Sequence, residues 1–133
     1  MLPQPQPQPA AARVLVADDD VLVRVAFAEA LRTAGFVVIE ASCADEALGY
    51  IRAGGKVDLV FSDIQMPGGI DGRQLAALMA EEHPEIPVVL ASGETHLGAG
   101  APTRLFVAKP FSLEHTVALL LSLLGLRLPE GGS

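Results

Sequence analysis

The stretch LVFSD, residues 59–63, is a short apolar run that ends at an aspartate. Three other runs have the same form: VLVA at 14–17 precedes three aspartates, VVLA at 88–91 precedes Ser92, and LFVA at 105–108 precedes Lys109. If the four runs are parallel strands of one sheet, their C-terminal ends share one edge, where open α/β sheets bind ligands. The pattern predicts carboxylates, a hydroxyl and an ammonium at one site, a set suited to Mg²⁺ and a phosphoryl group.

Helical patterns separate these runs along the chain. Apolar residues recur at helical spacing in residues 21–34, 42–52, 72–82 and from 113 onward, and 36–41 is a further strand-like run. Ser42 is expected to cap the second helix, with Asp45 completing a capping box, and Ser112 is expected to cap the last helix. Strands that alternate with helices predict an α/β fold, a five-stranded parallel sheet with helices on both faces.

Composition narrows the class of protein. The chain has 133 residues, is 50% hydrophobic and carries a net charge of −7, so it has room for one domain with a core and no basic stripe for nucleic acid. Cys43 is the only cysteine, and no cleavable signal segment is recognisable at the start. The apolar stretch 113–128 contains Glu114, His115 and Arg127 and is too short for a membrane span. We therefore expect a cytoplasmic location and neither direct nucleic-acid binding nor membrane insertion.

The acidic residues allow two interpretations. Asp20 alone could cap a helix, with its neighbours as ordinary surface charge. If the runs at 14–17 and 59–63 are adjacent strands, however, Asp18, Asp19 and Asp63 meet at one point and can hold a cation. Lys109 and Ser92 follow neighbouring runs, and a cis bond before Pro110 could aim the lysine at the same site.

The ordered set of motifs at residues 14–20, 58–72, 91–93 and 109–111 resembles the receiver domain of bacterial two-component response regulators. The resemblance covers about residues 13–124. It implies a doubly wound, flavodoxin-like sheet in the order 2-1-3-4-5. It also implies a phosphoprotein in which a histidine kinase or a histidine phosphotransfer protein phosphorylates an aspartate.

The resemblance assigns a role to each candidate residue. Asp63 is the phosphoacceptor, and Asp18, Asp19, Asp63 and the main-chain carbonyl of Gln65 form the Mg²⁺ site. Ser92 is the switch hydroxyl and Lys109 the phosphate-binding lysine. Phe106 occupies the position of an aromatic switch, although a half-buried phenylalanine is also ordinary in a strand.

Three segments fall outside the regular pattern. Proline and glutamine alternate in residues 3–9, and residues 1–11 are expected to form a disordered tail ahead of a receiver domain at 12–126. Residues 127–133 are expected to form a flexible C-terminal tail. Residues 93–103 are too short and glycine-rich for an ordinary crossover helix, so the fourth helix of the family is expected to be short or absent.

Three functions remain open from the sequence. The first is a signalling receiver that catalyses only its own phosphorylation and dephosphorylation and switches a surface for a downstream protein. The others are a Mg²⁺-dependent phosphatase or phosphotransferase with an aspartyl-phosphate intermediate, and a pseudo-receiver that only binds partners. Leu113, Val117, Leu120 and Leu124 are expected to face the sheet. Leu119, Leu123 and Leu126 are expected to form an outer stripe for docking or a homodimer, unless residues 93–103 cover it.

Overall fold

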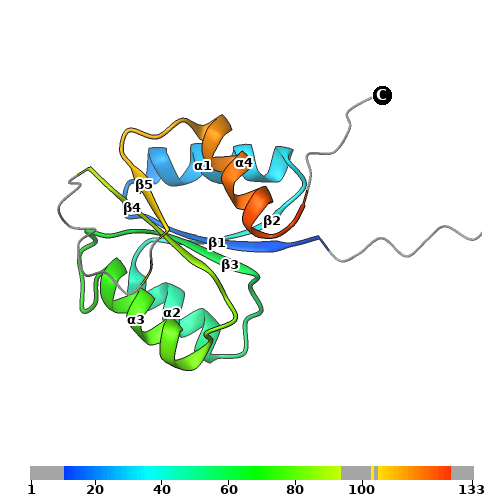
Figure 1. Cartoon of the computed structure of the whole chain (residues 1–133). Coiled ribbons are helices and arrows are strands. Elements are labelled where there is room, and N and C mark those ends of the chain that lie inside the picture. The colour runs from blue at the N-terminus through cyan, green and yellow to red at the C-terminus, as the bar shows by residue number, and fades with distance from the viewer. Residues whose placement is uncertain (1–10, 94–102, 104, 127–133) are drawn as a thin grey trace, which may run out of the picture.

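A parallel sheet in the order β2-β1-β3-β4-β5 is the centre of the computed structural model, which describes residues 11–93, 103 and 105–126 (Figure 1). Its strands are β1 (Arg13–Ala17), β2 (Val37–Ala41), β3 (Leu59–Asp63), β4 (Val88–Ser92) and β5 (Phe106–Ala108). The helices described are α1 (Val21–Thr33), α2 (Ala44–Arg52), α3 (Gly72–Glu82) and α4 (Leu113–Leu123). Helices α1 and α4 lie on one face of the sheet, and α2 and α3 lie on the other. The predicted fold class and strand order are confirmed.

The sheet separates two apolar clusters. Leu15 and Val60 point into the cluster beneath α2 and α3, whereas Val14 and Phe61 point into the cluster beneath α1 and α4. All five residues of β3 are buried, since this strand lies in the middle of the sheet with helices on both sides. Burial on both faces explains why the inner strands β1, β3 and β4 read as continuous apolar runs and not as an alternating pattern.

Side-chain caps begin three of the four helices described. Asp20, Asp71 and Ser112 accept hydrogen bonds from main-chain N–H groups in the first turns of α1, α3 and α4. The predicted Ser42 cap is wrong. The N-cap of α2 is Cys43, which makes no side-chain cap bond, and the Ser42 hydroxyl instead donates to Glu46 at 2.9 Å.

The exposure of the leucines in and after α4 differs from the prediction. Val117 and Leu120 are buried against the sheet as expected, but Leu113 is 37% exposed. On the predicted outer stripe, Leu123 packs partly against the core, while Leu126 is 42% exposed. The apolar stripe facing solvent is therefore narrower than the sequence pattern indicated.

The predicted loss of the fourth family helix concerns residues 93–103, and 94–102 lie outside the described part of the chain. Of the two predicted tails, 1–11 and 127–133, only residue 11 lies within the described part of the chain. Within the ranges that the structure does describe, no helix is long and apolar enough to cross a membrane.

Candidate phosphorylation and metal site

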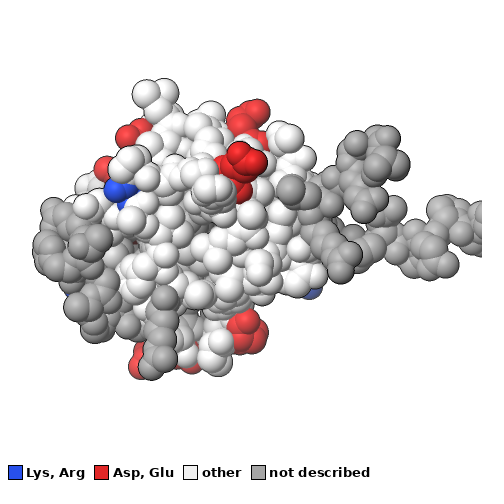
Figure 2. All heavy atoms as spheres, turned by 45° about the horizontal axis from the view of Figure 1, so that its top comes forward, with Lys and Arg blue, Asp and Glu red and all other residues white. Residues whose placement is uncertain are grey.

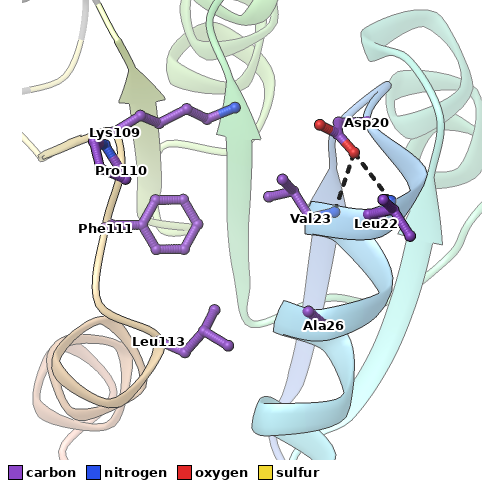
Figure 3. A pocket seen from close by; sticks show the side chains of 8 residues that line it. All are labelled: Asp20, Leu22, Val23, Ala26, Lys109, Pro110, Phe111 and Leu113. Atoms are coloured by element: carbon purple, nitrogen blue, oxygen red, sulfur yellow. Dashed lines mark hydrogen bonds between the residues drawn. The ribbon is translucent and has the colours of Figure 1, made fainter.

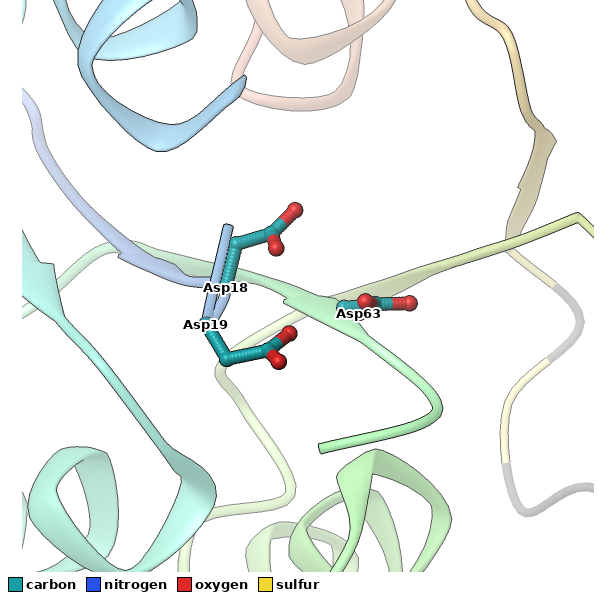
Figure 4. A group of neighbouring side chains, drawn as sticks. All are labelled: Asp18, Asp19 and Asp63. Carbon is teal, nitrogen blue, oxygen red and sulfur yellow. The ribbon is translucent and has the colours of Figure 1, made fainter. Parts of the chain in front are cut away.

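Three aspartates converge at the C-terminal edge of the sheet. Asp18 and Asp19 follow β1, Asp63 is the last residue of β3, and the two strands are paired neighbours. One carboxylate oxygen from each aspartate lies within 4.8 Å of the others (Figure 4). Asp18 and Asp63 are buried and Asp19 is exposed, so the group opens to solvent on one side.

Lys109 joins this group from the far side of β4. Its Nζ lies 3.2 Å from Oδ2 of Asp63 and 3.3 Å from Oδ2 of Asp18. The main-chain N–H of Lys109 donates to the carbonyl of Ser92 at 2.9 Å, which fixes the start of the loop that follows β5. The peptide bond between Lys109 and Pro110 is cis, as the sequence analysis anticipated.

Burial and neighbouring charges both shift the pKa values of Asp63 and Lys109. Burial raises the pKa of Asp63 above its ordinary value, Lys109 opposes this shift, and Asp18 and Asp19 add to it. Burial lowers the pKa of Lys109, but the carboxylates of Asp63 and Asp18 outweigh burial, and the net shift is upward. One ammonium among three carboxylates leaves negative charge in excess. Clustered hard oxygen atoms with such an excess fit a divalent cation such as Mg²⁺.

The turn after β1 is fixed by its own hydrogen bonds. Oδ1 of Asp18 accepts from the N–H of Asp20 at 2.9 Å, and the main-chain carbonyl of Asp18 accepts from the Arg24 guanidinium at 2.9 Å. Arg24 also pairs with Glu40 on β2 at 3.2 Å. Asp20 accepts from the N–H groups of Leu22 and Val23 and is thus a helix cap, the role that the alternative interpretation gave it.

Sequence reasoning missed Arg24. A signal existed in its position four residues after an N-cap aspartate, which places it on the turn that faces Asp18. Nothing in the local pattern shows that the side chain folds inward, however. In the structure it is only 16% exposed.

The other predicted site residues, Ser92, Gln65 and Phe106, differ in burial and in position. Ser92 is buried at the end of β4, between β3, which ends at Asp63, and β5, which Lys109 follows. Gln65 is exposed, two residues beyond Asp63. Phe106 is half-buried and packs against the cluster beneath α2 and α3. Of all the predicted site residues, Asp18, Asp19, Asp63 and Lys109 form the group of charged side chains described above.

An apolar groove of about 560 Å³ adjoins the site between α1 and the segment that follows β5 (Figure 3). Its lining is Asp20, Leu22, Val23, Ala26, Lys109, Pro110, Phe111 and Leu113. Leu22 is 83% exposed, and Figure 2 shows that the face over α1 and α4 is largely uncharged. Phe111 lines the groove, and its ring packs edge-on against the buried rings of Phe27 and Phe61. The centroid of the Phe111 ring lies 5.4 Å from the centroid of each of these rings.

Comparison with known proteins identifies the family. The profile of the response regulator receiver domain matches residues 14–120. The chain belongs to the response regulator receiver domain family. Receiver domains of this family accept phosphoryl groups in two-component signalling, and this receiver shares that role.

Similar proteins include regulators and a sensor kinase. The receiver is 37% identical over 109 residues to the sensor kinase CckA of Brucella abortus. The aligned residues make up 77% of this chain and 11% of the kinase. The solved receiver domain of NtrX from Brucella abortus is 32% identical, with a TM-score of 0.77, over 86% of this chain and 99% of that domain.

A third similar protein was crystallised with ligands. The response regulator TrrA of Thermotoga maritima, solved in complex with Mg²⁺ and BeF, is 27% identical with a TM-score of 0.77, over 84% of this chain and 98% of TrrA. The receiver spans only 11–24% of the length of the first curated relatives it matches, the kinase and three regulatory proteins.

Proposed function

We propose that Asp63 is the residue that accepts the phosphoryl group, from a phosphohistidine on a histidine kinase or a histidine phosphotransfer protein. A carboxylate oxygen of Asp63 forms the new bond to phosphorus as the bond between phosphorus and the imidazole nitrogen breaks, and the electron pair of that bond stays on the imidazole. The observation that carries this proposal is the contact of Asp63 with Lys109 beside two further carboxylates. Asp18 is also buried and also contacts Lys109, but its other carboxylate oxygen already accepts from the N–H of Asp20, whereas Asp63 ends the middle strand of the sheet.

Asp18, Asp19 and Asp63 would hold Mg²⁺, together with the main-chain carbonyl of Gln65. When bound, Mg²⁺ neutralises negative charge on the phosphoryl oxygens and on the carboxylates around them. The clustered oxygen atoms support this assignment, as does the similar TrrA receiver that was crystallised with Mg²⁺ and BeF. Lys109 orients Asp63 before transfer, through the 3.2 Å contact between the ammonium and Oδ2.

Phosphorylation would change the hydrogen bonds around Asp63. The phosphoryl oxygens offer new acceptors to the Lys109 ammonium and to the Ser92 hydroxyl. Ser92 ends β4, so its movement toward the phosphoryl group would pull on the segment that follows it. Phe106 lies on the neighbouring strand and would change its rotamer as that segment moves.

The receiver would function in the bacterial cytoplasm, with protein partners only. The groove between α1 and Phe111 would receive the phosphohistidine donor, since it is apolar, open and lined by Lys109. A downstream protein would bind the surface that phosphorylation alters, and the C-terminal end of α4 would supply a second contact or a homodimer interface, together with the exposed Leu126 just beyond it. Residues 12–126 would form the receiver domain, with tails at 1–11 and 127–133.

Incubation of the protein with acetyl phosphate and Mg²⁺ tests the proposal. Intact mass spectrometry should show one added phosphoryl group on the wild type and none on Asp63→Asn. Asp58→Asn is the matched control, because Asp58 is an exposed aspartate just before the same strand and should leave labelling unchanged. Equal labelling of the Asp63→Asn variant would refute the assignment.

A further inference from the structure

The loop between β3 and α3 is fixed at its C-terminal end. The N–H of Gly72 donates to the carbonyl of Ile64 at 2.8 Å, and a side chain at Gly72 would overlap the main-chain oxygen of Asp63. Glycine is therefore required there for α3 to begin directly against the phosphoacceptor strand. The loop leaves the site after Ile64 and returns to it at Gly72.

Two successive glycines form the tip of this loop, between Met66 and Ile70, whose side chains pack partly against the cluster beneath α2 and α3. Gly68 has a φ of +109°, a conformation that other residues rarely adopt, and Gly69 follows it. Two successive glycines have the largest backbone entropy to lose on ordering. The glycines contribute no side-chain packing, so a contact to their main chain would help the tip to hold one shape.

Asp45 supplies that contact from α2. Its Oδ2 accepts hydrogen bonds from the N–H of Gly69 at 2.9 Å and from the N–H of Ile70 at 3.3 Å. The capping box predicted for Asp45 is absent, since the N-cap of α2 is Cys43 and no side chain caps the helix. An ionised carboxylate that accepts two N–H groups makes a stronger contact than a neutral acceptor.

We propose that Asp45 is a positioning residue for the phosphorylation site, and this inference rests on the proposed function. It holds the tip of the loop at residues 64–71 so that the part that carries the Gln65 carbonyl stays beside Asp63. Without the contact, the two glycines would sample several conformations, and Mg²⁺ binding would have to order them. Asp45 lies outside the carboxylate group at the site, so it acts through the loop and does not contact the cation.

Two substitutions distinguish the role of Asp45 as a hydrogen-bond acceptor from the effect of its negative charge. Asp45→Asn keeps an oxygen that can accept both N–H groups but removes the negative charge, whereas Asp45→Ala removes both. Glu46 provides a matched control, because it is the next acidic residue in the first turn of α2 and its carboxylate accepts from Ser42. If Asp45 acted only as a charge near the helix N-terminus, Asp45→Asn, Asp45→Ala and Glu46→Gln would have similar effects.

Titration with Mg²⁺ by isothermal calorimetry is the first measurement. The dissociation constant should rise roughly 3- to 10-fold in Asp45→Ala, the cost of one lost hydrogen-bonded contact. It should rise much less in Asp45→Asn and stay unchanged in Glu46→Gln. Melting temperatures of the metal-free variants should stay close to that of the wild type, because Asp45 is exposed.

Amide hydrogen exchange on the metal-free wild type gives a second, independent test. The N–H groups of Gly69 and Ile70 should exchange more slowly than that of Gly68, and Asp45→Ala should remove the difference. Unprotected amides in the wild type would overturn the inference, as would equal Mg²⁺ affinity in Asp45→Ala and wild type, or equal damage in Asp45→Asn and Asp45→Ala. A wild type that does not bind Mg²⁺ at all would contradict the proposed function itself, and the inference with it.

Discussion

The Lys109 ammonium lies 3.2 Å from Oδ2 of Asp63. Asp63 ends β3 and Lys109 follows β5, so the lysine side chain reaches past the end of β4 to make this contact. This contact places a positive charge directly on the carboxylate of the proposed phosphoacceptor. It compensates part of the cost of burying the Asp63 carboxylate, but not all of it, because the pKa of Asp63 remains raised.

Asp63→Asn should stabilise the metal-free protein at neutral pH. The folded-state pKa of Asp63 lies above its value of 3.8 in the unfolded chain, so stability from this group is present below about pH 3.8 and is lost as pH rises through the folded pKa. At pH 7 the ionised carboxylate therefore destabilises the fold. We expect the melting temperature of the variant to exceed that of the wild type by a few degrees at pH 7 and to match it below pH 4. A lower melting temperature at pH 7 would contradict this sign.

Mg²⁺ should raise the melting temperature through binding to the folded state. At a concentration 100 times its dissociation constant, a ligand that binds only the folded state adds about 2.7 kcal/mol to the free energy of unfolding. Asp19→Asn should remove most of this gain. Asp20→Asn should keep it, because Asp20 caps α1 and asparagine caps a helix as well as aspartate does. Equal Mg²⁺ responses of these two variants would show that the cation binds elsewhere.

Arg24→Gln should weaken both the fold and the site. The Arg24 guanidinium donates to the carbonyl of Asp18 and pairs with Glu40, and its side chain is only 16% exposed. Losing these contacts should lower the free energy of unfolding by about 1–3 kcal/mol in chemical denaturation and should reduce Mg²⁺ affinity. Arg32→Gln removes the exposed partner of the same glutamate and should cost less than about 0.5 kcal/mol. Equal losses in the two variants would refute a special role for Arg24.

Gly72→Ala should be strongly destabilising, because the added Cβ would overlap the main-chain oxygen of Asp63. We expect a loss of about 1–3 kcal/mol or more, together with slower phosphorylation by acetyl phosphate. Gly49→Ala is the control. Gly49 lies inside α2 with no atom near the new Cβ, and this change should add up to about 1 kcal/mol of stability. A harmless Gly72→Ala would show that the start of α3 can shift away from Asp63.

Much of the fold followed from local pattern. The inner strands β1, β3 and β4 are runs of mostly buried residues, and the edge strands β2 and β5 are partly buried. Each apolar run that leads to the site stops where the chain turns at the edge of the sheet, so the polar residues at positions 18, 63, 92 and 109 marked that edge in advance. The order of the strands came from the family resemblance, because periodicity along a chain does not determine which strands are neighbours.

The errors and omissions concern single side chains. Ser42 and Asp45 matched the spacing of a capping box, but Asp45 binds a loop that lies 24 residues further along the chain, which local spacing cannot reveal. Arg24 was missed for the same reason. The capping box of Asp71 and Gln74 was visible in the sequence and was overlooked.

Chemical mapping of the phosphorylated residue tests the central claim most directly. After phosphorylation with acetyl phosphate and Mg²⁺, borohydride reduces an aspartyl phosphate to homoserine, and peptide mass spectrometry locates the altered residue. We predict homoserine at position 63 in the wild type and unaltered peptides in Asp63→Asn. Homoserine at position 18, 19 or elsewhere, with Asp63 unaltered, would contradict the account.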